Sequence, residues 1–160
     1  MKILITGGSG FLGSALAQHL HGIGNNVALL LRPASRLDRL HGLEGALDIG
    51  RCMTDADVDS FVQRIQPDVV IHTACNYGRH GESPLQISDT NVRFGLQVLQ
   101  SLIQIGKPLT FINTGTVLAP EVNLYALTKH QFVQWGRFLT SQSDSQIRFV
   151  NVLLQHMYGS

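Results

Sequence analysis

The sequence predicts an α/β fold, in which a doubly wound parallel sheet carries helices on both of its faces. Short apolar runs alternate along the 160 residues with longer segments in which apolar residues recur at helical spacing. The clearest run, residues 27–31, is apolar without interruption, which is typical of a strand covered on both faces. Because parallel strands joined by helices need right-handed crossovers, we expect the strand order 3-2-1-4-5-6.

The composition limits the classes of protein and site that we expect. The apolar share of 44% suits one domain with a core, and a net charge of +1 gives no electrostatic reason to bind nucleic acid or an anionic membrane. No apolar run approaches the roughly 20 residues of a membrane span. Cys52 and Cys75 lack a metal or redox spacing and no cleavable leader precedes the first strand, so we expect a cytoplasmic protein. The seven histidines are scattered, and we expect no metal site.

The first strand, at residues 3–6, runs into a glycine turn and then a helix that begins near Phe11 and Leu12. The glycines have the spacing G-x-x-G-x-x-G: Gly7, Gly10 and Gly13. Glycine permits a tight turn and leaves no side chain between the main chain and a ligand. The helix would point its free N–H groups and positive dipole end at a pyrophosphate. A purely structural turn is the alternative, but the flanking strand and amphipathic helix favour a Rossmann-type dinucleotide-binding turn.

The middle of the chain continues the alternation. The first helix ends at Gly22 or Gly24, and a strand follows at 27–31. A short strand is predicted around residues 46–49. Thr54 is placed to cap the next helix, whose buried stripe is Val58, Phe61, Val62 and Ile65. The remaining elements are a strand at 68–74, a long helix ending near Gly106, a strand at 109–113, a helix at 124–140 and a strand at 148–154.

Tyr125 and Lys129 are the candidate acid/base pair. Four residues apart, they share one face of the predicted helix. A phenol titrates near ~10, and a neighbouring ammonium would favour the phenolate and bring its pKa closer to neutral. A partly exposed helix pair without function is the alternative. The preceding strand ends in Asn113-Thr-Gly-Thr116, which places hydroxyls at the carboxyl edge of the sheet.

With these motifs in order, the chain resembles the extended short-chain dehydrogenase/reductases, in the nucleotide-sugar epimerase/dehydratase group. The matching stretches are the cofactor loop at 6–13, Asp68-Val-Val-Ile-His-Thr-Ala74, Asn91-Val-Arg-Phe-Gly95, the residues Thr114, Tyr125 and Lys129, and His156-Met-Tyr-Gly159. The resemblance implies that Tyr125 is the general acid/base and that Lys129 holds the nicotinamide ribose and lowers the pKa of the tyrosine. Thr114 would orient the reacting oxygen, with Thr116 as a weaker candidate.

The resemblance also implies the remaining cofactor contacts. Asp48 and Ile49 would meet the adenine. The ribose and pyrophosphate would pass along Thr73, Ala74 and Cys75. Asn91 is placed among the cofactor-binding residues, either as a structural tie between the long helix and the fourth strand or as a proton relay.

Arg32 bears on the choice of cofactor. Folds that select NAD usually place an acidic residue near the end of the second strand, to accept from the ribose 2′-OH. Here Arg32 stands there, followed by Ser35 and Arg36, and a cation with a hydroxyl suits a 2′-phosphate. We therefore expect NADP, with NAD as the alternative.

We expect residues 1–160 to form an NAD(P)-binding domain, and the substrate-binding C-terminal half of the family to be absent. The activity implied is hydride transfer, with epimerisation, dehydration or reduction of a nucleotide-linked sugar. An NADPH-dependent reductase of small carbonyl compounds and a non-catalytic NAD(P)-sensing regulator are the alternatives. Family members often form homodimers, and Phe132, Trp135 and Phe138 would serve such a face or the core.

Overall fold

The computed structural model describes residues 1–142 and 144–155. Its centre is a six-stranded sheet in the order β3-β2-β1-β4-β5-β6, with every pair of neighbours parallel, as predicted. The strands are β1 (Lys2–Thr6), β2 (Asn26–Leu31), β3 (Asp48–Arg51), β4 (Val69–His72), β5 (Leu109–Thr116) and β6 (Ile147–Leu154). The helices are α1 (Phe11–Gly22), η1 (Asp38–Leu40), α2 (Asp55–Ile65), α3 (Pro84–Ser88), η2 (Asp89–Arg93), α4 (Phe94–Ile105) and α5 (Leu124–Thr140).

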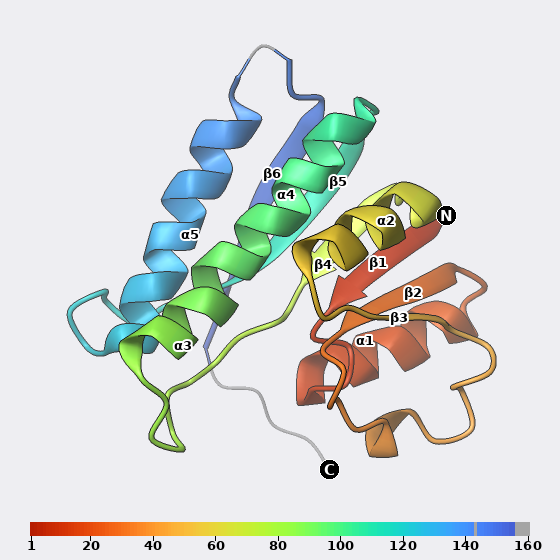
Figure 1. Cartoon of the computed structure of the whole chain (residues 1–160), viewed down its shortest axis with the longest axis horizontal. Coiled ribbons are helices and arrows are strands. Elements are labelled where there is room, and N and C mark those ends of the chain that lie inside the picture. Colours follow the sequence, from red (N-terminus) through yellow and green to blue (C-terminus); the bar gives the residue numbers. More distant parts are fainter. Residues whose placement is uncertain (143, 156–160) are drawn as a thin grey trace.

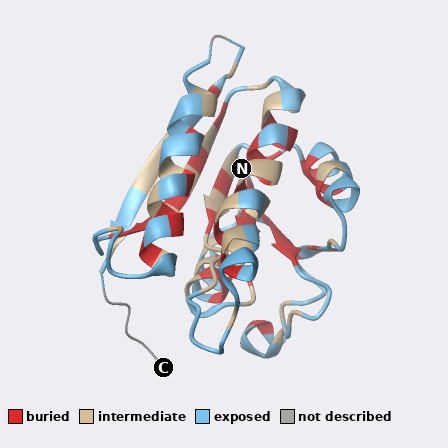
Figure 2. Cartoon of the chain, turned by 60° about the vertical axis from the view of Figure 1, so that its left-hand side comes forward, coloured by how far each residue is buried: buried red, intermediate tan, exposed pale blue. Residues whose placement is uncertain are grey.

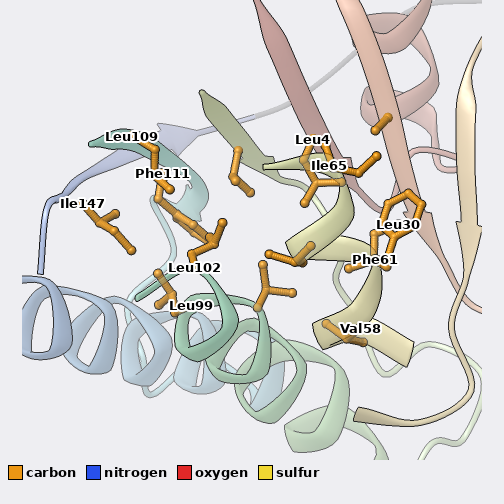
Figure 3. Close-up of a cluster of buried hydrophobic side chains, with 14 of the residues drawn as sticks. Leu4, Leu30, Val58, Phe61, Ile65, Leu99, Leu102, Leu109, Phe111 and Ile147 are labelled. Carbon is orange, nitrogen blue, oxygen red and sulfur yellow. The ribbon is translucent and has the colours of Figure 1, made fainter. Parts of the chain in front are cut away.

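The helices cover both faces of the sheet (Figure 1). Successive residues of β1 point to opposite faces, so Leu4 joins one hydrophobic cluster while Ile3 and Ile5 join the other. The first cluster packs α2, α4 and α5 against the sheet (Figure 3). The second packs α1 and the segment around η1 against the opposite face. In Figure 2 the buried residues concentrate between these layers, and the outer sides of the helices are exposed.

Most elements begin and end where local chemistry dictates. The Thr54 hydroxyl accepts from the Asp57 N–H and the Asp57 side chain accepts from the Thr54 N–H, so a capping box starts α2 as expected. All four predicted stripe residues of α2 are buried. The Asn123 side chain caps α5, whose bounds agree with the prediction. The predicted long helix is a continuous succession of α3, the π-helical η2 and α4, which ends at the left-handed Gly106 (φ 67°).

Three strands differ from the prediction by two residues or more. The fourth strand, predicted at 68–74, is shorter and covers Val69–His72. The third strand begins at Asp48 and not at 46, because turn hydrogen bonds from the N–H groups of Ala46 and Leu47 to the Leu43 carbonyl occupy the preceding residues. The fifth strand continues to Thr116, because its last residues pair with β6 as far as Leu154. The predicted motif at 156–159 lies outside the described residues.

Within the described part of the chain, no helix is long and apolar enough to cross a membrane. On α5, Phe132 is buried in the core, whereas Trp135 and Phe138 are 50% and 62% exposed.

Candidate active site

A cavity of about 750 Å³ lies at the carboxyl ends of the central strands. This is the edge of a doubly wound sheet at which ligands bind, because the strand order reverses there. Eleven of the predicted site residues line it: Gly7, Gly10, Phe11, Leu12, Gly13, Arg32, Thr73, Ala74, Cys75, Thr114 and Tyr125. Asp48, Ile49, Asn91 and Lys129 are not among the lining residues.

The glycine turn brings three pieces of backbone closer than side chains would allow. Gly7 adopts φ +69°, and a Cβ added there would lie 2.7 Å from the Ala74 nitrogen. A Cβ on Gly13 would lie 2.3 Å from the Gly7 carbonyl oxygen. At Gly10 the added Cβ would meet only that oxygen, at 3.3 Å, so this glycine leaves its part of the cavity open.

The first turn of α1 is suited to bind an anion. No side chain caps the helix, and its first turn holds no acidic residue. The first N–H groups of a helix have no partners within it, and the dipole adds partial positive charge there. Because Phe11, Leu12 and Gly13 line the cavity, these residues fit the pyrophosphate of a dinucleotide.

The loop after β2 presents Arg32 and Ser35 to the cavity. Arg51, at the end of β3, donates from Nη1 to the carbonyl oxygens of Pro33 (2.6 Å) and Ser35 (2.9 Å), which fixes the shape of this loop. Arg36 pairs with Asp38 at 2.7 Å. Among the described residues, Arg32 forms no ion pair with a carboxylate.

The structure does not bring Asp48 and Ile49 to the cavity. They pair with Ala28 and Leu29 in the middle of β2, before the carboxyl ends of the strands at which the cavity lies. Two hydrogen bonds of 2.7 Å join Asp48 to Arg64, and this guanidinium holds the pKa of the carboxyl below its usual range. The residues that follow β3, Cys52 and Met53, line the cavity in their place. Sequence reasoning missed these two because it assigned the adenine contacts from the family resemblance, which pointed to Asp48 and Ile49.

Asn91 acts as a structural tie. It is buried in η2, and its Nδ2 donates to the Asn76 carbonyl oxygen and to the Thr128 hydroxyl, both at 2.9 Å. Its Oδ1 accepts from the Asn76 N–H at 2.6 Å. These hydrogen bonds therefore join η2 to α5 and to the loop that follows β4. The predicted tie was to the fourth strand, and the observed one reaches the loop after it.

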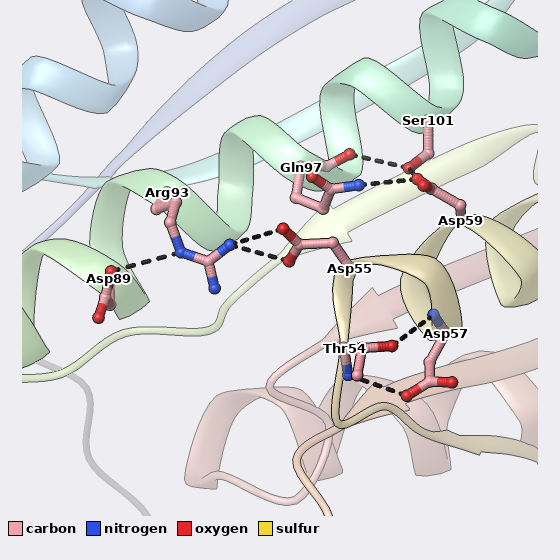
Figure 4. Close-up of polar contacts among 8 residues, drawn as sticks. All are labelled: Thr54, Asp55, Asp57, Asp59, Asp89, Arg93, Gln97 and Ser101. Atoms are coloured by element: carbon pink, nitrogen blue, oxygen red, sulfur yellow. Dashed lines mark hydrogen bonds and ion pairs between the residues drawn. The ribbon is translucent and has the colours of Figure 1, made fainter.

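Ion pairs join α2 to η2 beside the cavity (Figure 4). Arg93 Nη1 donates to both carboxylate oxygens of Asp55, at 2.8 and 3.0 Å, and its Nε lies 3.3 Å from Asp89. All three residues line the cavity, and the sequence analysis did not single out any of them. Further along α2, Asp59 accepts hydrogen bonds from Gln97 and Ser101 of α4.

Tyr125 lies at the cavity wall with its ring stacked on Tyr77, at 4.7 Å between centroids. Burial raises the pKa of the Tyr125 phenol, while the hydroxyls of Thr116 and Tyr77 act in the opposite direction. The prediction that Lys129 brings this pKa toward neutral is wrong for this structure, because loss of hydration by the phenolate dominates. Lys129 itself is buried, and burial lowers its pKa.

The two threonines at the end of β5 differ in their partners. The Thr114 hydroxyl donates to the His72 carbonyl oxygen of β4 at 2.9 Å. The Thr116 hydroxyl accepts from the Leu118 N–H at 3.2 Å and interacts with the Tyr125 hydroxyl, whose pKa it lowers. Both residues line the cavity, and of the two only the Thr116 hydroxyl acts on the pKa of Tyr125.

In the part of the chain that the structure describes, no group of three or more histidine, cysteine or acidic residues could hold a metal ion. Cys52 and Cys75 are free thiols.

The sequence matches one known family along almost its whole length. The model of the NAD dependent epimerase/dehydratase family matches residues 3–160. The chain belongs to this family. It is 28% identical to CDP-abequose synthase of Salmonella typhimurium (strain LT2) over 167 residues, which cover 98% of this chain and 53% of that protein. It is 30% identical to UDP-glucose 4-epimerase of Klebsiella pneumoniae over 132 residues, 76% of this chain and 94% of that one.

Solved structures show the same fold. The UDP-glucose 4-epimerase of Thermus thermophilus, in complex with NAD, superimposes with a TM-score of 0.79 at 21% identity, over 94% of this chain and 54% of that chain. The Bordetella bronchiseptica enzyme WbmH, in complex with NAD⁺, gives 0.79 at 23% identity, over 95% and 55%. The chain thus spans about half the length of these proteins and of CDP-abequose synthase.

Proposed function

We propose that the whole protein is an NAD(P)-dependent enzyme that acts on a nucleotide-linked sugar, and that this chain supplies its dinucleotide site and its acid/base residue. One observation carries the proposal. A single cavity runs from the glycine turn, which fits a pyrophosphate, to the Tyr125 hydroxyl and its neighbour Thr116. The family and the names of the relatives, CDP-abequose synthase and UDP-glucose 4-epimerase, support a nucleotide sugar as the substrate class.

The cofactor would be held along the carboxyl edge of the sheet. The glycine turn and the first turn of α1 receive the pyrophosphate, Cys52 and Met53 border the adenine, and residues 73–75 form the wall beside the ribose. When bound, the nicotinamide supplies the redox chemistry.

The protein's own part in the reaction is to move a proton. With its pKa raised by burial, Tyr125 is protonated at neutral pH and can donate to a substrate carbonyl oxygen. Thr116 hydrogen-bonds the same oxygen and fixes its orientation. Thr114 remains the alternative for this role, although its proton is already donated to β4. The family resemblance assigns the nicotinamide ribose to Lys129, although its side chain is buried on α5 and does not line the cavity.

We also propose a preference for NADP over NAD. Arg32 and Ser35 stand at the end of β2, where a 2′-phosphate would lie, and Arg51 fixes the loop that carries Ser35. A guanidinium and a hydroxyl form charge-assisted hydrogen bonds to a phosphate.

Turnover of two variants tests the enzymatic proposal. In the full-length protein, Tyr125→Phe removes the hydroxyl and keeps the ring, so turnover of UDP-glucose or a CDP-linked hexose should fall roughly 10²–10⁴-fold with unchanged cofactor affinity. Lys129→Ala should lower both turnover and cofactor affinity. Near-normal turnover by Tyr125→Phe would contradict the proposal and leave a dinucleotide-binding fold whose chemistry lies elsewhere.

A further inference from the structure

Tyr77 is the residue in closest aromatic contact with Tyr125. Their rings are stacked, with an interplanar angle of 27° and 4.7 Å between centroids. Tyr77 comes from the loop after β4 and Tyr125 from the first turn of α5, so the contact joins two segments far apart in the sequence. Both residues line the cavity, and each is only partly buried.

The backbone on either side of Tyr77 is fixed. Asn91 binds both the N–H and the carbonyl oxygen of Asn76, and the Asn76 side chain accepts from the Gly78 N–H at 2.9 Å. Gly78 adopts φ +70°, and a Cβ there would lie 2.9 Å from Ile87. The Tyr77 ring is therefore carried by a turn that is anchored to the buried Asn91.

Arg79 covers the Tyr77 ring in turn. Its guanidinium carbon lies 4.9 Å from the ring centroid, in a cation–π arrangement. Arg79 lines the cavity, and within residues 1–142 and 144–155 it makes no ion pair with a carboxylate. Arg93, on the same cavity, is instead neutralised by Asp55 and Asp89.

A half-exposed phenol on the first turn of a helix has several rotamers open to it, and acid/base catalysis needs one. A flat ring against one of its faces removes the rotamers that would swing the hydroxyl away from Thr116. We propose that Tyr77 is a positioning residue for Tyr125: its stacked ring holds the phenol of Tyr125 beside Thr116 at the cavity wall. This inference rests on the proposed acid/base role of Tyr125. The Tyr77 ring makes the stack, and the Tyr77 hydroxyl, which lowers the pKa of Tyr125, is not needed to hold the Tyr125 ring in place.

Turnover of Tyr77→Ala and Tyr77→Phe in the full-length protein tests the inference, with UDP-glucose or a CDP-linked hexose as the probe. Tyr77→Ala should lower kcat on the order of 10–100-fold, since a misplacement of about 1 Å can cost that much. KM and the cofactor Kd should change less than about threefold, because ring orientation acts on the chemical step. Tyr77→Phe keeps the stack and should restore kcat. Unchanged kcat in Tyr77→Ala, or no rescue by Tyr77→Phe, would overturn the inference.

A double variant shows whether Tyr77 acts through Tyr125. In the Tyr125→Phe background there is no catalytic hydroxyl to orient, so adding Tyr77→Ala should lower kcat no further. An equal loss of kcat in both backgrounds would mean that Tyr77 acts by another route and would overturn the inference. If Tyr125→Phe alone keeps its turnover, the proposed acid/base role of Tyr125 is wrong, and this result is distinct from a failure of the Tyr77 inference.

A measurement without substrate tests the stack by itself. The chain has three tyrosines, so the ¹³Cζ resonance of Tyr125 can be assigned by comparing labelled wild type with Tyr125→Phe and Tyr77→Phe. Both variants lose the Tyr77 hydroxyl, which lowers the pKa of Tyr125, so in Tyr77→Phe the Tyr125 resonance should titrate at higher pH than in wild type. In Tyr77→Ala it should titrate at lower pH than in Tyr77→Phe, because only the alanine also lets water hydrate the phenol. Equal Tyr125 titrations in the two variants would show that the Tyr77 ring does not cover Tyr125 and would overturn the inference.

Discussion

The α-carbon of Gly13 stands so close to the carbonyl oxygen of Gly7 that a Cβ on Gly13 would lie 2.3 Å from it. The second neighbour of that Cβ would be the Gly8 Cα, at 2.8 Å. Both are backbone atoms, which cannot move aside as a flexible side chain can. The first turn of α1 therefore rests directly on the turn after β1, and this contact brings the N-terminus of the helix to the cavity.

Gly13→Ala should lower the free energy of unfolding by about 1–3 kcal/mol, because the methyl group forces α1 away from β1. It should also weaken cofactor binding, since the first turn of α1 moves with the helix. Gly22→Ala is the matched control. Gly22 ends the same helix and its Cβ would meet nothing within 4 Å, so alanine should leave stability unchanged or raise it by up to about 1 kcal/mol. Urea unfolding of both variants decides, and equal stabilities would contradict this account of the turn.

Arg32→Ala should remove most of the preference for NADP, on the order of 1–3 kcal/mol for a charge-assisted contact. Arg36→Ala is the control, because Arg36 pairs with Asp38 and does not line the cavity. Titration of NADPH and NADH against wild type and both variants measures the preference. If wild type binds NADH more tightly than NADPH, the proposed preference is wrong.

The sequence predicted α5 and the glycine turn because each depends on a local pattern, and the sheet order because right-handed crossovers between the predicted strands restrict it. Uninterrupted apolar runs, capping residues and glycine spacing can all be recognised in the sequence without knowledge of tertiary contacts. The start of the third strand was harder to predict, because it depends on turn hydrogen bonds to the Leu43 carbonyl. The adenine contacts that the resemblance implied, Asp48 and Ile49, do not line the cavity, whereas Cys52 and Met53 after β3 do.

Other parts of the site depend on contacts between distant segments. Nothing near Tyr77 in the sequence indicates that its ring stacks on Tyr125, 48 positions later. The choice between Thr114 and Thr116 likewise depends on strand geometry. Their hydroxyls meet different neighbours, which only the pairing of β5 with β4 and β6 determines.

Acid should destabilise the protein through His72. This side chain is fully buried, its Nδ1 lies 2.8 Å from the Thr6 hydroxyl, and its ring packs against Phe132. Burial, and secondarily the charge of Lys129, lower the pKa of His72 to about 3. Above pH ~6.5 the imidazole is neutral in both the folded and the unfolded chain. Below it the unfolded chain binds a proton that the folded chain does not, so stability falls by up to about 1.4 kcal/mol per pH unit.

His72→Asn keeps a hydrogen-bonding atom for Thr6 and removes the titration. Its free energy of unfolding should depend less on pH than that of wild type between about pH 6.5 and 5, where most carboxylates remain ionised. Exposed His41→Asn serves as the control and should keep the wild-type slope. Urea unfolding at several pH values measures the slopes, and identical slopes for wild type and His72→Asn would rule out the buried neutral imidazole as the cause.

The last prediction separates the two threonines of β5. Thr116 interacts with the Tyr125 hydroxyl, so Thr116→Val should lower turnover by about 10²-fold, with little change in stability beyond the lost contact to the Leu118 N–H. Thr114 donates to the His72 carbonyl oxygen, so Thr114→Val should cost about 1 kcal/mol of stability and keep most of the turnover. Valine has the shape of threonine, so each substitution removes one hydroxyl and little else. Turnover and urea unfolding of both variants in the full-length protein provide the comparison. The reverse pattern, with turnover lost in Thr114→Val and kept in Thr116→Val, would return the orienting role to Thr114.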